Sequence, residues 1–257
     1  MRQGFVETGG HRLEYLLHDA HQTARPTLVF LHEGLGSISL WRDFPQRIAQ
    51  MTGCRTLVYS RHGYGNSDVL EGPRKPDYMH VEALDALPQV LASLGIERPL
   101  LVGHSDGGSI ALIHAGNGRW PCAGVAVLAP HLFVEEMSVR GIEETVRIFE
   151  TTDLPQKLAR HHRDARRTFY GWADIWRHPD FRVWNIEDCL SGLRCPVLAI
   201  QGEDDEYATM AHLDRIAQAA VDAPDVELLK LADCRHSPQR DQADAVAAAL
   251  AAFVERI

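Results

Sequence analysis

Short apolar segments alternate with helix-like segments along most of this 257-residue chain, and this alternation constrains the fold more than any other feature. Strands that are apolar on both faces must be covered on both sides, which is typical of a parallel sheet between two helical layers. The sequence therefore predicts an α/β fold with a doubly wound, mostly parallel sheet. The predicted strands are 27–32, 54–60, 99–103, 123–129, 196–201 and 226–231.

Two other patterns complete this outline. Residues 4–8 and 12–18 flank a Gly9-Gly10 pair, which predicts a β-hairpin before the alternation begins. Helix-like stretches then follow most of the predicted strands, as a doubly wound sheet requires. These stretches are 40–51, 80–94, 109–114 and 243–257.

The alternation lapses between about His131 and Leu193, where helix-like stretches occur without a comparable apolar strand. A chain of this length can form one core that carries an insertion. We therefore predict a core made of residues 1–131 and 194–257, and a helical lid made of residues 132–193.

Charge and hydropathy limit the partners of the chain. Its net charge of -9 opposes binding to a polyphosphate backbone, and its most basic run, 160–167, is typical of a solvated helix face. The chain has no stretch of about 18 apolar residues, and its first ten residues lack an apolar signal region. We expect a cytoplasmic protein that binds neither nucleic acid nor membrane.

The sequence offers little support for metal or phosphate chemistry. Its five cysteines are widely spaced and include no CxxC pair, which predicts reduced thiols rather than disulfides or a zinc site. It also contains no G-x-x-x-x-G-K-[ST] loop and no H-E-x-x-H motif. We expect neither a metal nor another cofactor.

The segment 103–107 reads GHSDG and matches the pattern G-x-S-x-G. The pattern alone is weak evidence, but here it lies between an apolar strand and a helix, which is the context that gives it meaning. Glycines flank the serine because a sharp strand-to-helix turn leaves no room for neighbouring Cβ atoms. We predict Ser105 as a nucleophile.

A serine hydroxyl needs a base and a group that orients this base. The loop 202–206 (GEDDE) follows one predicted strand, and the loop 234–238 (CRHSP) follows the next. Because loops beyond the carboxyl ends of parallel strands converge, we predict His236 as the base. Asp205, three residues past the glycine that ends the strand, is the predicted acid, and Asp204 is its rival.

Five motifs together resemble the α/β-hydrolase superfamily, in particular its lid-bearing serine esterases and carbon-carbon hydrolases. They are HEGLGS (32–37), RHGYGNS (61–67), GHSDGG (103–108), GEDDEY (202–207) and CRHSP (234–238), and the resemblance covers nearly the whole chain. It implies the α/β-hydrolase fold, and an oxyanion hole formed by the N–H groups of Gly34 and Asp106. The sequence departs from the family pattern at Glu33, where glycine is usual.

The predicted lid contains three of the five tryptophans of the chain. Its aromatic side chains either form the core of the lid or face Ser105 and bind a flat acyl group. We assign Trp172 and Trp176 to substrate binding, together with His104 and His131, which line the pocket or orient neighbouring loops.

The side chain of Asp106 has two interpretations. It either caps the helix by accepting N–H bonds from Gly108 or Ser109, or it pairs with a cationic group of the substrate.

These features favour a serine hydrolase that cleaves a carboxylic ester of a small, potentially aromatic, substrate through an acyl-enzyme. Ser at the nucleophile position disfavours the epoxide hydrolase and dehalogenase branches of the superfamily. A carbon-carbon bond hydrolase of aromatic ring-cleavage products and an acyl thioesterase remain alternatives, because the same triad serves both. A hydrolase-like binding protein without activity is an alternative of another class. A homodimer also stays open.

Overall fold

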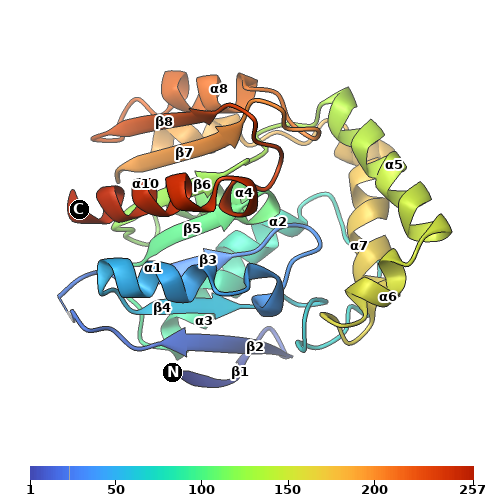
Figure 1. Cartoon of the computed structure of the whole chain (residues 1–257), viewed down its shortest axis with the longest axis horizontal. Coiled ribbons are helices and arrows are strands. Elements are labelled where there is room, and N and C mark those ends of the chain that lie inside the picture. Colours follow the sequence, from blue (N-terminus) through green and yellow to red (C-terminus); the bar gives the residue numbers. More distant parts are fainter. Residues whose placement is uncertain (23) are drawn as a thin grey trace.

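The computed structural model describes residues 1–22 and 24–257, and a sheet of eight strands runs through its centre (Figure 1). The strand order is β1-β2-β4-β3-β5-β6-β7-β8, with antiparallel pairing only where β2 joins β1 and β4. The prediction of a mostly parallel α/β sheet is thus confirmed. The strands are β1 (Arg2–Thr8), β2 (His11–His18), β3 (Leu28–Leu31), β4 (Thr56–Tyr59), β5 (Leu100–His104), β6 (Gly124–Leu128), β7 (Val197–Gly202) and β8 (Val226–Leu231).

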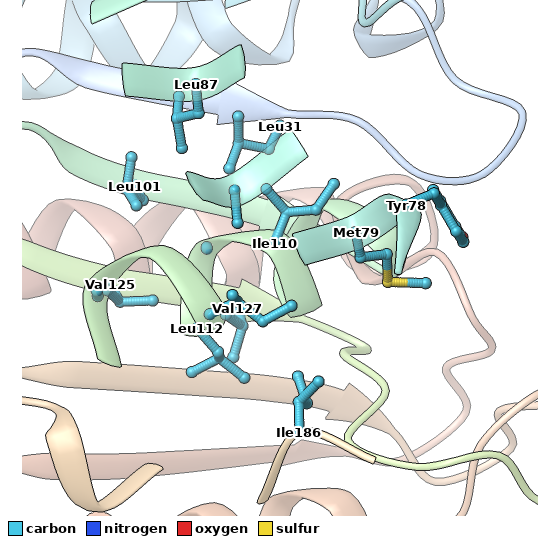
Figure 2. Packing of buried hydrophobic residues seen from close by; sticks show 14 of the residues in the cluster. Leu31, Tyr78, Met79, Leu87, Leu101, Ile110, Leu112, Val125, Val127 and Ile186 are labelled. Carbon is cyan, nitrogen blue, oxygen red and sulfur yellow. The ribbon is translucent and has the colours of Figure 1, made fainter. Parts of the chain in front are cut away.

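The central strands are buried on both faces, which explains their uninterrupted apolar sequences. In β3, Leu28 and Phe30 pack toward helices α1 (Phe44–Thr52) and α10 (Ala243–Glu255), whereas Val29 and Leu31 pack toward α3 (Leu87–Ser93) and α4 (Asp106–Gly116). Each fully buried side chain of this kind contributes about 1.5–3 kcal/mol. Figure 2 shows the core on the side of the sheet that α3 and α4 cover, where strand residues meet helix α4. Its labelled members include Leu31, Leu101, Val125, Val127, Ile110 and Leu112.

Helices cover both faces of the sheet (Figure 1). The predicted helix 80–94 is interrupted, because a π-helical turn, η2 (Glu82–Ala86), joins α2 (Tyr78–Val81) to α3 (Leu87–Ser93). Helix α8 was not predicted, since its apolar face is short. The helices of the core, with the 3-10 turn η1, are η1 (Ile38–Trp41), α1 (Phe44–Thr52), α2 (Tyr78–Val81), α3 (Leu87–Ser93), α4 (Asp106–Gly116), α8 (Ala211–Ala219), α9 (Pro238–Asp241) and α10 (Ala243–Glu255).

The segment between β6 and β7 is helical and lies to one side of the sheet (Figure 1). Its two long helices pack together through the stacked rings of Phe149 and Phe169, whose centroids are 3.7 Å apart. None of the helices in residues 1–22 and 24–257 has the length and apolarity that crossing a bilayer requires. The elements of this segment are α5 (Glu136–Thr151), α6 (Leu154–Leu158), α7 (Ala165–Arg177), η3 (Pro179–Phe181) and η4 (Glu187–Gly192).

Candidate active site

Ser105 lies on a sharp turn between β5 and α4. Its φ of 52° and ψ of -118° fall in a region that residues with a side chain rarely occupy, and such backbone strain is common at functional sites. A Cβ at Gly103 would lie 2.1 Å from the carbonyl oxygen of Gly107, and one at Gly107 would lie 2.0 Å from that of Leu31. The turn therefore requires both glycines of the G-x-S-x-G segment.

The structure brings the three predicted triad residues together. The hydroxyl of Ser105 lies 3.0 Å from Nε2 of His236, on the loop after β8. Nδ1 of the same imidazole lies 2.9 and 3.0 Å from the two carboxylate oxygens of Asp205, on the loop after β7. This geometry lets His236 accept the hydroxyl proton while Asp205 holds the ring.

Asp205, rather than its rival Asp204, faces the histidine. The Asp205 side chain is buried, and its Oδ1 accepts hydrogen bonds from the N–H groups of Tyr207 (2.8 Å) and Ala208 (3.2 Å). Its Oδ2 accepts a further bond from the amide of Gln201 (3.2 Å). Asp204 is exposed.

The charges of the two partners stabilise each other. Burial acts to lower the pKa of His236, but the hydrogen bond and charge of Asp205 outweigh it, so this pKa is raised. Burial acts to raise the pKa of Asp205, but the bond to His236 holds it below its usual range. The pair is therefore suited to hold an imidazolium during a reaction.

Two backbone N–H groups are available near Ser105. Gly34 lines the cavity at the serine, and Asp106 is the first residue of α4, where the helix dipole favours negative charge. In the described part of the chain, neither N–H donates to a protein acceptor. Both are therefore free to bind an oxyanion, as the resemblance implied.

Hydrogen bonds from Arg61 hold the loop that carries Gly34. Nε2 of His32 accepts a hydrogen bond from the N–H of Arg61 (3.0 Å), whose guanidinium donates to the carbonyl oxygen of Glu33 (3.0 Å). A Cβ at Gly34 would lie 2.1 Å from Nε1 of Trp172, so this position requires glycine.

A cavity of about 220 Å³ opens beside Ser105. Trp172 and Trp176 of α7 lie on its wall, as predicted, while other lid aromatics such as Phe169 and Phe181 are buried in the core. Core packing thus holds for Phe169 and Phe181, whereas binding of an acyl group by Trp172 and Trp176 stays a prediction. The wall is formed by Glu33, Gly34, Leu35, Ser105, His131, Ser138, Ile142, Thr145, Trp172, Trp176, Tyr207, His236, Ser237 and Arg240.

His131 also lies on this wall, as predicted. Its side chain is almost fully buried, and burial together with the nearby His212 holds its pKa well below the usual range. No residue of the described chain forms a hydrogen bond with its Nδ1. The ring on the cavity wall is therefore a neutral imidazole, and its Nδ1 is enclosed by protein.

The prediction that His104 binds substrate is wrong for this cavity, because its ring lies behind the wall. Its Nε2 donates a hydrogen bond to the carbonyl oxygen of His236 (2.7 Å), and its Nδ1 lies 3.0 Å from the amide nitrogen of Gln239. His104 therefore orients the loop that carries His236, which was the alternative role considered.

Both interpretations of the Asp106 side chain are wrong. The N–H groups of Gly108 and Ser109 donate to the carbonyl oxygen of Ser105 (2.8 and 3.1 Å) instead. The Asp106 carboxylate is buried beneath α4, accepts a hydrogen bond from the hydroxyl of Tyr78 (2.7 Å) and lies 3.7 Å from the guanidinium of Arg61.

This buried contact was missed from the sequence. Arg61 belongs to the RHGYGNS motif, which was the only available signal, and nothing in the sequence pairs it with Asp106.

The thiols of the chain are unpaired, as expected, and burial raises the pKa of Cys122 and of Cys189 to about 12 each. Across residues 1–22 and 24–257, no group of three or more His, Cys, Asp or Glu side chains is placed to hold a metal ion.

Comparisons with known proteins place these features in context. The model of the alpha/beta hydrolase family matches residues 28–249. A 2-hydroxy-6-oxo-6-phenylhexa-2,4-dienoate hydrolase of Comamonas testosteroni is 23% identical, over 90% of this chain and 88% of its own.

Solved structures are similar over nearly the whole chain. The enol-lactonase from Burkholderia xenovorans LB400 superposes with a TM-score of 0.76 at 20% identity, covering 98% of this chain and 100% of its own. A proline iminopeptidase of Mycobacterium smegmatis has a TM-score of 0.74 at 20% identity, covering 99% and 98%.

Proposed function

This chain belongs to the alpha/beta hydrolase family, and we propose that it is a serine hydrolase that cleaves a carboxylic ester of a small substrate. One observation carries the proposal: the strained Ser105 lies 3.0 Å from Nε2 of His236, and Asp205 holds the other side of that ring. This arrangement supports nucleophilic catalysis by the serine hydroxyl.

Acylation begins when Oγ of Ser105 attacks the ester carbonyl carbon. The hydroxyl proton passes to Nε2 of His236 as the Oγ–C bond forms, and the carbonyl electron pair moves to oxygen. The N–H groups of Gly34 and Asp106 receive this oxyanion, and each donor of this kind is worth about 3 kcal/mol. The ester C–O bond then breaks, and the leaving alkoxide takes the proton from Nε2 and departs as the alcohol.

Deacylation repeats these steps with water. Nε2 of His236 accepts a proton from water while the hydroxide oxygen bonds to the acyl carbon, and the oxyanion again binds the two N–H groups. The Oγ–C bond then breaks and Ser105 regains its proton, which releases a carboxylic acid. Asp205 stabilises the imidazolium in both halves of the reaction.

The cavity supports a small substrate. Its volume of about 220 Å³ beside Ser105 leaves room for a short or flat acyl group. Two tryptophans on the wall favour an apolar or aromatic surface on that group.

Hydrolysis of a carbon-carbon bond is the second candidate, because the Comamonas testosteroni relative that matches 90% of this chain is named for cleaving a dienoate. The carboxylate of Glu33 on the cavity wall argues against it, since a dienoate is itself an anion. Arg240 at the exposed rim is the charge that could offset this repulsion.

A fluorophosphonate probe tests the proposal, because it reacts with activated serines. We expect labelling of the protein at Ser105, no labelling of Ser105→Ala, and faster turnover of 4-nitrophenyl esters than of a vinylogous diketone. An unlabelled native protein would instead support a binding protein without activity. Faster turnover of the diketone would support the carbon-carbon candidate.

A further inference from the structure

Glu33 places a carboxylate on the wall of the cavity, at the position where the resemblance implied glycine. The side chain is 29% exposed. One oxygen, Oε2, lies 3.4 Å from Nδ1 of His104. The other oxygen, Oε1, accepts no hydrogen bond from another residue in the described part of the chain, so it is free to bind a ligand.

This carboxylate is charged under ordinary conditions. Burial acts to raise the pKa of Glu33, but the adjacent His104 outweighs it and lowers the pKa to about 2. His104 lies beside one oxygen of this half-buried charge, and the other oxygen has no partner, which leaves the charge incompletely compensated. A positively charged group that enters the cavity would supply this partner.

The rest of the wall suits the same kind of ligand. Trp172, Trp176 and Tyr207 line the cavity together with Glu33. Cations are attracted to the faces of aromatic rings, most strongly to tryptophan, and quaternary ammonium groups are recognised in this way. Arg240, the cationic side chain of the wall, is exposed at the rim rather than enclosed.

From this combination we infer that Glu33 and the aromatic wall form a subsite for an ammonium group, and that the preferred substrates are esters that carry one. The inference rests on the proposed hydrolase function and specifies its substrate class. Without it, Glu33 would serve only to hold His104 and thereby the His236 loop.

Matched esters separate these two roles. Butyrylcholine and 3,3-dimethylbutyl butyrate differ by a positive nitrogen in the alcohol part, and betaine ethyl ester and ethyl 3,3-dimethylbutanoate differ likewise in the acyl part. We expect Glu33→Gln to lower kcat/KM for the cationic member of at least one pair by about thirtyfold, or about 2 kcal/mol, as for the loss of one partner of a buried charge pair. The neutral member should change less than about threefold.

Glu203→Gln is the matched control, because Glu203 is an exposed carboxylate on the Asp205 loop, outside the cavity wall. It makes the same change in net charge and should affect neither pair. Equal losses for both members of each pair in Glu33→Gln, or no loss at all, would overturn the ammonium subsite.

A binding measurement on the native protein tests the inference even if the Glu33→Gln variant does not fold and even if no ester is cleaved. Quenching of tryptophan fluorescence in the native protein should give a Kd for choline at least about tenfold lower than that for 3,3-dimethylbutanol. Equal Kd values would exclude the subsite even if esters are cleaved. A preference for choline with no cleavage of any ester would contradict the proposed hydrolase and leave the subsite standing.

Discussion

The hydroxyl of Tyr78 donates a 2.7 Å hydrogen bond to the carboxylate of Asp106, the residue whose N–H faces the proposed oxyanion. The same hydroxyl accepts a 3.1 Å bond from Nε1 of Trp176, on the cavity wall. Helix α2, the start of α4 and the lid helix α7 are thus joined at one buried phenol. The side chain of Asp106 therefore contributes to the architecture below the site.

Tyr78→Phe should lower the free energy of unfolding by about 1–3 kcal/mol, because it removes one hydrogen bond from each of two buried polar groups, the Asp106 carboxylate and the Trp176 indole. Chemical denaturation measures this loss. Tyr170→Phe is the control, since the Tyr170 hydroxyl bonds to the exposed Glu150 and its loss should cost under about 0.5 kcal/mol. Similar stabilities of the two variants would contradict a structural role for the buried phenol.

The pH profile of kcat/KM should report the protonation of His236. Its pKa is raised above the ordinary 6.5, because Asp205 outweighs the effect of burial. Since the base must be neutral to accept a proton, activity should fall as the pH drops through this raised pKa, with a midpoint above 6.5 in the acid limb.

Asp205→Asn should move that limb to lower pH and reduce kcat by about 10⁴-fold, because an amide favours the wrong imidazole tautomer. Asp204→Asn is the matched control and should leave both unchanged, since Asp204 is exposed. If the two variants behave alike, Asp205 is not the orienting acid.

The sequence predicted the elements whose chemistry is local. Strand β3 was recognisable because its four residues are all apolar, as burial on both faces requires. The turn at Ser105 was recognisable because its two glycines are required by contacts of 2.0 and 2.1 Å. The order of the loops after β7 and β8 was sufficient to predict His236 as the base and an acid on the loop 202–206, whereas the choice of Asp205 over Asp204 rested on its spacing from the strand.

Contacts between distant segments could not be predicted in this way. The partners of Asp106 come from the loop after β4 and from α2, and no periodicity relates Arg61 or Tyr78 to position 106. His104 was assigned to the cavity because it is next to Ser105. His104 ends β5 and Ser105 lies on the strained turn beyond it, so adjacency in sequence does not place both side chains on the cavity wall, and His104 bonds to the His236 carbonyl instead.

Gly34→Ala should reduce kcat by tenfold or more, because its Cβ would lie 2.1 Å from Nε1 of Trp172 and displace the N–H that receives the oxyanion. Steady-state kinetics on a 4-nitrophenyl ester measures the loss. The double variant Gly34→Ala/Trp172→Ala restores the space and should lose less, relative to Trp172→Ala alone. Gly72→Ala is the control outside the cavity wall, because Gly72 is exposed and an added Cβ there meets nothing within 4 Å; additive effects of the two cavity substitutions would contradict the steric explanation.

The acyl preference should depend on Trp172, because its ring lines the cavity next to Gly34. An aromatic contact is worth about 0.5–1.5 kcal/mol, so Trp172→Ala should lower kcat/KM for 4-nitrophenyl benzoate relative to 4-nitrophenyl propionate by about two- to twelvefold. The leaving group is common to both esters, and the ratio cancels any loss of folded enzyme. Trp184→Ala removes a buried lid tryptophan outside the cavity wall and should leave the ratio unchanged. An unchanged ratio in Trp172→Ala would mean that this ring supports the lid and does not contact the acyl group.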